Sequence, residues 1–353
     1  MSGPGERIRI AVDAMGGDHG PEVIVRGAVE ALCTIDGDFE ILLVGDESRI
    51  WDILGGMKLG PLPIFSVHAE DQVAMDEKVP KAMRSKPRSS IALCTGLVGR
   101  RRAGALVSAG NTGALVAASL LNLGRMPGIQ RPAITATIPT PQGQCVMLDV
   151  GANADCKPVH LFQFAHMGRI FAKLVLGIAE PRVGLLNIGE EASKGSALAQ
   201  AAHELLAADR DRLNFVGNVE GRDIFAGRAD VVVCDGFTGN VILKLAGSIA
   251  AVGSRMAAHA IERSPLVRLG ALLMKPALSD LKRRFNYEEY GGALLLGTHG
   301  ISVICHGRSS PRAIRNAIWV ALRAIRGDLE GSIARVLSEQ EAGRLAAAGE
   351  SAH

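Results

Sequence analysis

The sequence has few aromatic residues and little net charge. Two Trp, two Tyr and nine Phe among 353 residues leave little for base-stacking platforms. The 39 basic and 36 acidic residues nearly balance, so the chain lacks the overall field that a nucleic-acid-binding protein needs. We therefore expect no nucleic acid among its partners.

Signals for secretion, membrane spanning and metal binding are also missing. The N-terminus has no apolar core of a signal peptide, and no window reaches the roughly 18 uninterrupted apolar residues that a spanning helix needs. The six cysteines form no C-x-x-C pair, which disfavours a zinc ribbon or a redox motif. These absences predict a cytoplasmic globular protein with buried thiols and no metal.

Standard nucleotide and hydrolase motifs are absent as well. The sequence contains no G-x-x-x-x-G-K-[ST], no G-x-S-x-G and no H-E-x-x-H, and Gly16-Gly17 does not complete G-x-G-x-x-G. A Walker site, a standard dinucleotide site and a covalent Ser or Cys triad are therefore unsupported. We expect no cofactor.

Apolar runs of strand length alternate with longer amphipathic segments along most of the chain. This alternation is typical of βαβ units and predicts an α/β fold with a mostly parallel sheet. We expect strands at 8–12, 39–44, 62–67, 105–108, 133–138, 145–150, 183–188, 214–219, 231–234 and 301–305. We expect helices from Pro21 to about 32 and at 90–101, 111–123, 158–176, 196–207, 238–259 and 312–325. One α/β domain should cover 8–326, followed by a C-terminal helix or tail at 327–353.

Six glycine-rich polar turns follow predicted strands: 13–18, 108–113, 149–155, 187–195, 217–221 and 235–240. Ligands of parallel sheets bind outside the carboxyl ends of the strands, so we expect these turns at matching ends of one sheet. Exposed backbone N–H groups at helix starts suit an anion such as phosphate. One such turn is ordinary capping, whereas six favour a phosphate site.

Lysines within or just after these turns are few. Lys194 lies between Ser193 and Gly195, while Lys157 and Lys244 are alternatives. A solvated lysine is the competing interpretation for each, and Lys194 is the strongest candidate for touching an anion.

Residues 253–284 depart from the alternation. They are helix-prone, are broken at Pro265 and Pro276, and hold an apolar cluster flanked by basic residues. A helical hairpin over 253–285 is expected, either buried in a dimer interface or with an apolar tip in a membrane boundary. The membrane-contacting residues would be Leu266, Leu269, Leu272 and Leu273.

A second basic stretch, 78–102, holds eight Lys and Arg and no acid. A solvated face is the default interpretation, and a docking patch for an acidic protein is the alternative. The near balance of the whole chain thus hides two basic segments.

Several of these segments resemble one family. Ile10–Asp18 (IAVDAMGGD) resembles the opening of the PlsX-type phosphate acyltransferases, the acyl-[acyl carrier protein]:phosphate transacylases of bacterial phospholipid synthesis. Further blocks look like that family in the expected order: Ser108–Ala114, Leu148–Asn153, Asn187–Glu191, Cys234–Asn240 and Glu289–Ala293. His19 stands where many members have a small polar residue such as Asn.

The resemblance implies a three-layer fold similar to phosphotransacetylases and isocitrate or isopropylmalate dehydrogenases, in a homodimer. It also implies that inorganic phosphate attacks the thioester of a long-chain acyl carrier protein, with no covalent acyl-enzyme. The acyl phosphate would feed a membrane glycerol-3-phosphate acyltransferase, so the enzyme would work peripherally at the inner face of the cell membrane. Phosphate is already an anionic nucleophile, so the protein must mainly position it and stabilise the oxyanion.

The resemblance and the turns together assign roles to residues. Lys194 would hold phosphate or the developing charge, and Asn240 would donate to the oxyanion. Asp13 and Asp149 would orient the lysine or nearby amides, or serve only as caps. Ser108, Asn111, Thr112 and Gly113 would cradle phosphate at a helix start, and the other substrate-binding candidates are Gly16, Gly17, Asn153, Asn187, Thr238 and Gly239.

Three alternatives stay open. A metal-dependent hydroxyacid dehydrogenase of similar fold would need clustered carboxylates, which are not evident in the sequence. A phosphotransacetylase using short acyl-CoA is closer. A non-enzymatic membrane scaffold would leave the polar turns unexplained.

Overall fold

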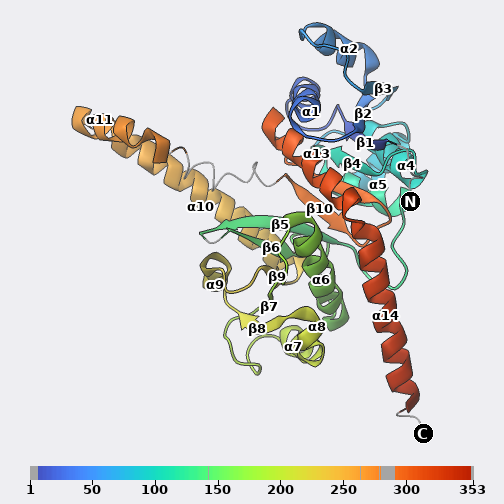
Figure 1. The fold of residues 1–353 in the computed structure, drawn as a ribbon, viewed down its shortest axis with the longest axis vertical. Helices are drawn as coiled ribbons and strands as arrows, with labels where there is room; N and C mark the ends of the chain where they lie inside the picture. Colours follow the sequence, from blue (N-terminus) through green and yellow to red (C-terminus); the bar gives the residue numbers. More distant parts are fainter. Residues whose placement is uncertain (1–6, 142, 263, 278, 280–290, 351–353) are drawn as a thin grey trace.

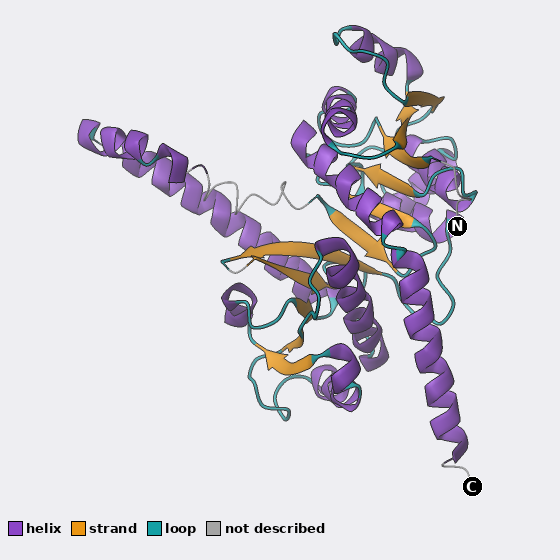
Figure 2. Ribbon diagram, in the orientation of Figure 1, coloured by secondary structure: helices purple, strands orange, loops and turns teal. Residues whose placement is uncertain are grey.

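A computed structural model of the chain describes residues 7–141, 143–262, 264–277, 279 and 291–350. Among these residues, eleven strands form one sheet in the order β3-β2-β1-β4-β11-β10-β5-β6-β9-β7-β8, with helices on both sides (Figure 1, Figure 2). The strands are β1 (Ile8–Asp13), β2 (Phe39–Gly45), β3 (Ile64–His68), β4 (Ala105–Ser108), β5 (Ala133–Thr140), β6 (Gly143–Leu148), β7 (Val183–Leu186), β8 (Phe215–Val219), β9 (Val231–Val233), β10 (Ala293–Leu296) and β11 (Ile301–Ile304).

The helices fill most of the connections between these strands. They are α1 (Glu22–Thr34), α2 (Glu47–Gly55), α3 (Val79–Ser85), α4 (Ser90–Gly99), α5 (Thr112–Asn122), α6 (Pro158–Phe171) with a π-helical turn (Ala172–Leu176), α7 (Ala197–Ala208), α8 (Arg210–Leu213), α9 (Gly221–Ala226), α10 (Gly236–Glu262), α11 (Pro265–Leu273), α13 (Pro311–Arg326) and α14 (Leu329–Glu350). The expected α/β class and mostly parallel sheet are confirmed.

Alternate residues of the central strands pack into two different cores. Ile10 and Val12 of β1 pack with Ile314 of α13, whereas Ala11 packs with Ile91 of α4 and Leu115 of α5. Successive side chains of a strand point to opposite faces, so the sheet is covered on both sides. This gives the expected three layers.

Close helix packing strengthens one of these layers. A Cβ on Gly27 of α1 would lie 2.6 Å from Cβ of Ile314, so α1 and α13 approach closely because residue 27 has no side chain.

Strand direction reverses in the middle of the sheet. β3, β2, β1, β4 and β11 are mutually parallel, while β10 is antiparallel to both β11 and β5, and β5 is antiparallel to β6. β6, β9, β7 and β8 therefore run opposite to β1 and β4. The expectation that all six polar turns share one edge is wrong: two turns follow the first set of strands and four follow the second.

The sequence analysis also missed several short elements. β10, α2, α3, α8 and α9 have no counterpart among the predicted segments, and β10 is only four residues long. Two of the residues in the Glu289–Ala293 block, 289 and 290, lie outside the described residues, as does the end of the expected hairpin, 280–285.

The hairpin itself is present as α10 and α11, which project from the body (Figure 1). The helix is interrupted before Pro265, as predicted, and α11 has no buried residue. By length and composition alone, α10 is apolar enough to cross a membrane. The sequence analysis missed this property because it searched for uninterrupted apolar residues, and Lys244 and Arg255 interrupt the apolar sequence of α10. The predicted C-terminal helix is α14.

Candidate active site

The turns after β1 and β4 are in direct contact. The Ser108 hydroxyl donates a 2.6 Å hydrogen bond to Oδ2 of Asp13 and accepts one of 3.1 Å from the Gly110 N–H. A Cβ on Gly16 would lie 2.7 Å from the Gly110 nitrogen, so only glycine allows this approach. The two predicted turns thus form one rigid unit.

The carboxylate at the centre of this unit is shielded from solvent. Asp13 is fully buried, and burial raises its pKa, opposed by hydrogen bonds from Ser108 and Ser90. Asp13 is therefore placed to organise the turns rather than to contact a ligand. This is the structural role that the sequence analysis left open.

The N-terminus of α5 supplies exposed amide groups beside this unit. Oδ1 of Asn111 caps the helix by accepting from the Ala114 N–H at 3.0 Å, and its Nδ2 donates to the Met75 carbonyl at 2.9 Å. Thr112 and Gly113 are exposed at the helix start. Their amides and the helix dipole suit an anion, whereas the side chains of Ser108 and Asn111 already have internal partners.

A third turn at this edge was missed by the sequence analysis. β11 ends beside β4, and the Gly307 carbonyl accepts a 2.8 Å hydrogen bond from the Asp18 N–H. The Arg308 guanidinium is largely exposed and lies 3.8 Å from the Asp18 carboxylate. The signal was available, because the predicted strand 301–305 is followed at once by a His-Gly-Arg turn.

The turn after β6 is built around Asp149. Its Oδ1 accepts from the backbone N–H groups of Ile134, Gly151 and Ala152 at 3.0, 3.2 and 3.1 Å. Its Oδ2 accepts from the backbone and side-chain nitrogens of Asn153 at 2.7 and 2.9 Å. Both predicted residues therefore hold the turn in shape, and Asp149 orients the nearby amides of Gly151 and Ala152.

The first turn of α10 packs on this Asp149 turn. A Cβ on Gly236 would lie 2.6 Å from Oδ2 of Asp149, and one on Gly239 would overlap the Asp149 carbonyl. The Asp235 carboxylate accepts hydrogen bonds from the N–H and the hydroxyl of Thr238 at 2.9 and 2.8 Å. Asn240, only partly buried, places its amide beside Gly151, with its Oδ1 3.7 Å from where a Cβ on that glycine would stand.

Lys194 lies on the turn after β7, and β7 is the neighbour of β9 in the sheet. The Asn187 side chain shapes this turn by donating to the Lys194 carbonyl at 3.0 Å and accepting from the Ile188 N–H at 2.8 Å. The Lys194 side chain is exposed, and none of the ion pairs found among the described residues includes it. Its charge is therefore available to a ligand.

The two alternative lysines occupy helix positions. Lys157 precedes α6, where its backbone N–H donates to Nδ1 of His160 at 3.1 Å. Lys244 is exposed in the third turn of α10.

The buried thiols are unsuited to nucleophilic attack. Burial raises the pKa of Cys145 and of Cys305 to about 12, and it raises the pKa of Cys94 and of Cys234 well above the usual value. A thiolate, not a thiol, is the attacking form. These four cysteines are core residues, as predicted, but Cys33 is exposed and Cys156 is half-buried, so the prediction of buried thiols is wrong for Cys33.

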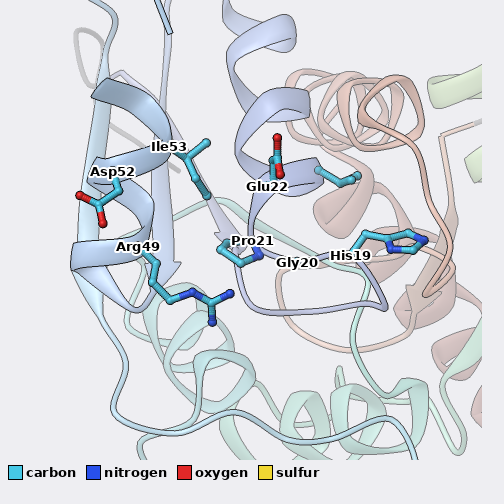
Figure 3. Close-up of a pocket in the computed structure, with 8 residues that line it drawn as sticks. His19, Gly20, Pro21, Glu22, Arg49, Asp52 and Ile53 are labelled. Carbon is cyan, nitrogen blue, oxygen red and sulfur yellow. The ribbon is translucent and has the colours of Figure 1, made fainter. Parts of the chain in front are cut away.

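An open hollow lies apart from the predicted ligand residues, between the start of α1 and α2. Arg49 and Ile53 of α2 lie opposite Pro21 there, and His19 is at its rim (Figure 3). None of the predicted catalytic or substrate-binding residues lines it.

The fold of this chain also occurs in solved phosphotransacetylases. A phosphotransacetylase from Streptococcus pyogenes superposes with a TM-score of 0.63 at 18% identity, covering 91% of this chain and 94% of that one. The EutD phosphotransacetylase from Staphylococcus aureus gives 0.59 at 15% identity, with 91% and 95% covered. The chain therefore has a phosphotransacetylase-like fold.

The chain belongs to the family described as fatty acid synthesis protein, which it matches over residues 8–330. Phosphate acyltransferases from Heliobacterium modesticaldum and Moorella thermoacetica are 50% and 49% identical to it over 327 and 333 residues, which are 92% of this chain and 96% of each relative. The resemblance stated from the sequence is confirmed, and the chain is an acyltransferase of fatty acid and phospholipid synthesis.

Proposed function

We propose that the enzyme transfers a long-chain fatty acyl group from acyl carrier protein to inorganic phosphate, giving acyl phosphate and the free carrier thiol. The observation that carries the proposal is the identity of about half of all positions with phosphate acyltransferases over nine tenths of the chain. The acyl phosphate would then serve a membrane glycerol-3-phosphate acyltransferase in phosphatidic acid synthesis.

In the proposed reaction a phosphate oxygen attacks the thioester carbonyl carbon directly. A tetrahedral oxyanion forms, the C–S bond breaks, and the leaving thiolate takes a proton. Lys194 holds phosphate or the developing charge and the Nδ2 of Asn240 donates to the oxyanion, both from turns that follow the second set of strands. The amides of Thr112 and Gly113, which follow a strand of the first set, cradle phosphate, so the proposal requires that the two groups of turns face one cleft. The burial of Cys94, Cys145, Cys234 and Cys305 and the engagement of Ser108 by Asp13 support a reaction without an acyl-enzyme.

The direct test is phosphate-dependent release of thiol from long-chain acyl carrier protein. Acetyl-CoA serves as the comparison, because preference for it would favour a short-chain phosphotransacetylase. NAD reduction with hydroxyacids tests the dehydrogenase alternative. If the rate of thiol release with phosphate does not exceed the rate without phosphate, the proposal is overturned.

We also propose that the enzyme is cytoplasmic and binds peripherally to the inner face of the membrane through α11. Leu266, Leu269, Leu272 and Leu273 are 83%, 59%, 64% and 77% exposed, and Arg268 lies among them. An exposed apolar tip with basic neighbours favours insertion at an anionic surface. The first turn of α10 is held on the Asp149 turn, which favours a helix that lies at the surface over one that spans the membrane.

A homodimer is compatible with this membrane contact, because α10 also carries exposed apolar residues such as Leu245, Ile249 and Met256. Leu269→Glu should abolish sedimentation with anionic phospholipid vesicles, while Leu121→Glu, at an exposed leucine of α5, should not. Unchanged binding of the first variant together with loss of the dimer in size-exclusion chromatography would assign the hairpin to the dimer interface alone.

A further inference from the structure

The basic stretch 78–102 divides into two parts in the structure. Several of its cations are neutralised: Lys86 pairs with Glu77 at 2.7 Å, and Arg88 pairs with Glu70 at 2.8 Å. At the far end, Arg100 and Arg102 follow α4, a helix of ten residues and so about 15 Å long. The stretch is therefore not one continuous patch.

Three further cations near the site lie on α3 or just before it. Lys78, Lys81 and Arg84 are exposed, and none of them belongs to an ion pair found among the described residues. Lys81 and Arg84 are three residues apart and therefore lie on one side of the helix, and Lys78 is the residue that precedes its first turn. We call Lys78, Lys81 and Arg84 the α3 ridge.

The α3 ridge borders the start of α5. A Cβ on Gly113 would lie 2.9 Å from Cγ2 of Val79, and Nδ2 of Asn111 donates to the Met75 carbonyl just before α3 at 2.9 Å. The ridge therefore adjoins the exposed amides of Thr112 and Gly113, which are the proposed phosphate cradle.

We propose that the α3 ridge is the docking surface for the acidic acyl carrier protein. The inference rests on the proposed function and names the surface that binds its protein substrate. Three exposed cations complement an acidic partner, and their place beside the α5 N-terminus would deliver the thioester to the phosphate. The hairpin of α10 and α11 projects away from the side on which α4 and α5 lie (Figure 1), which separates this surface from the proposed membrane contact.

The test reverses the charge of the ridge in the full-length protein. Lys81→Glu/Arg84→Glu should raise the KM for long-chain acyl carrier protein about tenfold at low salt while kcat stays within about twofold, because docking charges act mainly on encounter. Raising the salt concentration should reduce the difference in KM between the variant and the wild type. Turnover of acyl-pantetheine, a neutral thioester without the carrier, should not change.

Arg100→Glu/Arg102→Glu is the matched control. It makes the same change of charge just after the C-terminal end of α4, away from the α3 ridge. An unchanged KM for acyl carrier protein in the ridge variant would overturn the docking proposal, as would an equal loss with acyl-pantetheine. Loss of vesicle binding with normal carrier kinetics would assign the ridge to lipid and also overturn it. A wild-type enzyme that releases no thiol would instead refute the proposed function.

Discussion

The Ser108 hydroxyl donates a 2.6 Å hydrogen bond to Asp13, joining the ends of two neighbouring parallel strands 95 positions apart in the chain. The bond joins the first residues of two turns, and the turn that begins at Ser108 leads into the proposed phosphate cradle. It therefore links the stability of the fold to the geometry of the site.

Removal of this bond should produce a pH-dependent loss of stability. The folded state raises the pKa of Asp13, so folding stability falls as pH rises from the ordinary carboxyl range through the raised value. Ser108→Ala removes a hydrogen bond that opposes this rise, so it should cost about 1–3 kcal/mol and more at pH 8 than at pH 4. Urea unfolding across this range measures the effect.

Ser119→Ala is the matched control for that variant. The Ser119 hydroxyl is also buried, and it bonds to the Ser302 hydroxyl at 3.2 Å with no carboxylate involved. Its cost should be independent of pH. Equal pH profiles for the two variants would contradict the role given to Asp13.

The proposed catalytic pair should affect turnover rather than folding. Lys194 is exposed and Asn240 only partly buried, so Lys194→Ala and Asn240→Ala should leave the melting temperature nearly unchanged. Loss of one oxyanion donor lowers kcat about 100- to 1000-fold in other enzymes, and we expect an effect of this order for Asn240→Ala. Lys58→Ala, at an exposed lysine between α2 and β3, should keep wild-type turnover; wild-type turnover in both site variants would refute the assignment.

Much of the fold follows from local pattern, but the reversal of the sheet does not follow from apolar alternation. The length of the connection between β5 and β6 indicates the reversal. β5 ends at 140 and β6 begins at 143, whereas neighbouring parallel strands need a crossover of a dozen or more residues. Such a short link indicates a hairpin, so the reversal was predictable at that point. β10 was missed because four apolar residues carry too little period to identify a strand.

The candidate site was predicted at the level of turns and not of side-chain roles. Glycines and polar residues after strands pointed to Asp13, Ser108 and Asp149, which the structure places at the ends of β1, β4 and β6. Their engagement in internal hydrogen bonds depends on partners distant in sequence, such as Ile134 for Asp149. Spacing along the chain carries no record of those partners, so a ligand-binding role and a structural role looked alike.

Glu330 should contribute acid-sensitive stability at the start of α14. Burial raises its pKa, but hydrogen bonds from Arg101, His299 and the Gly300 N–H outweigh burial, so the net pKa is lowered. Its stabilisation is therefore present above the ordinary carboxyl pKa and is lost as pH falls through the lowered value. Glu330→Gln should cost about 1–3 kcal/mol at pH 7 and much less near pH 3 in chemical unfolding. A loss that stays constant with pH would show that the ionised carboxylate is not the source.

Two glycines of α10 should respond oppositely to the same substitution. A Cβ on Gly239 would overlap the Asp149 carbonyl, which is backbone and cannot rotate away, so Gly239→Ala should displace α10 from the Asp149 turn. Gly247, two turns further along, has no atom within 4 Å of its Cβ position, so Gly247→Ala should stabilise the helix by roughly 0.5–1 kcal/mol. Thermal unfolding and thiol-release assays on both variants measure the contrast. If Gly239→Ala melts and turns over like the wild type, α10 does not depend on this contact, and the placement of Asn240 beside Gly151 must be wrong.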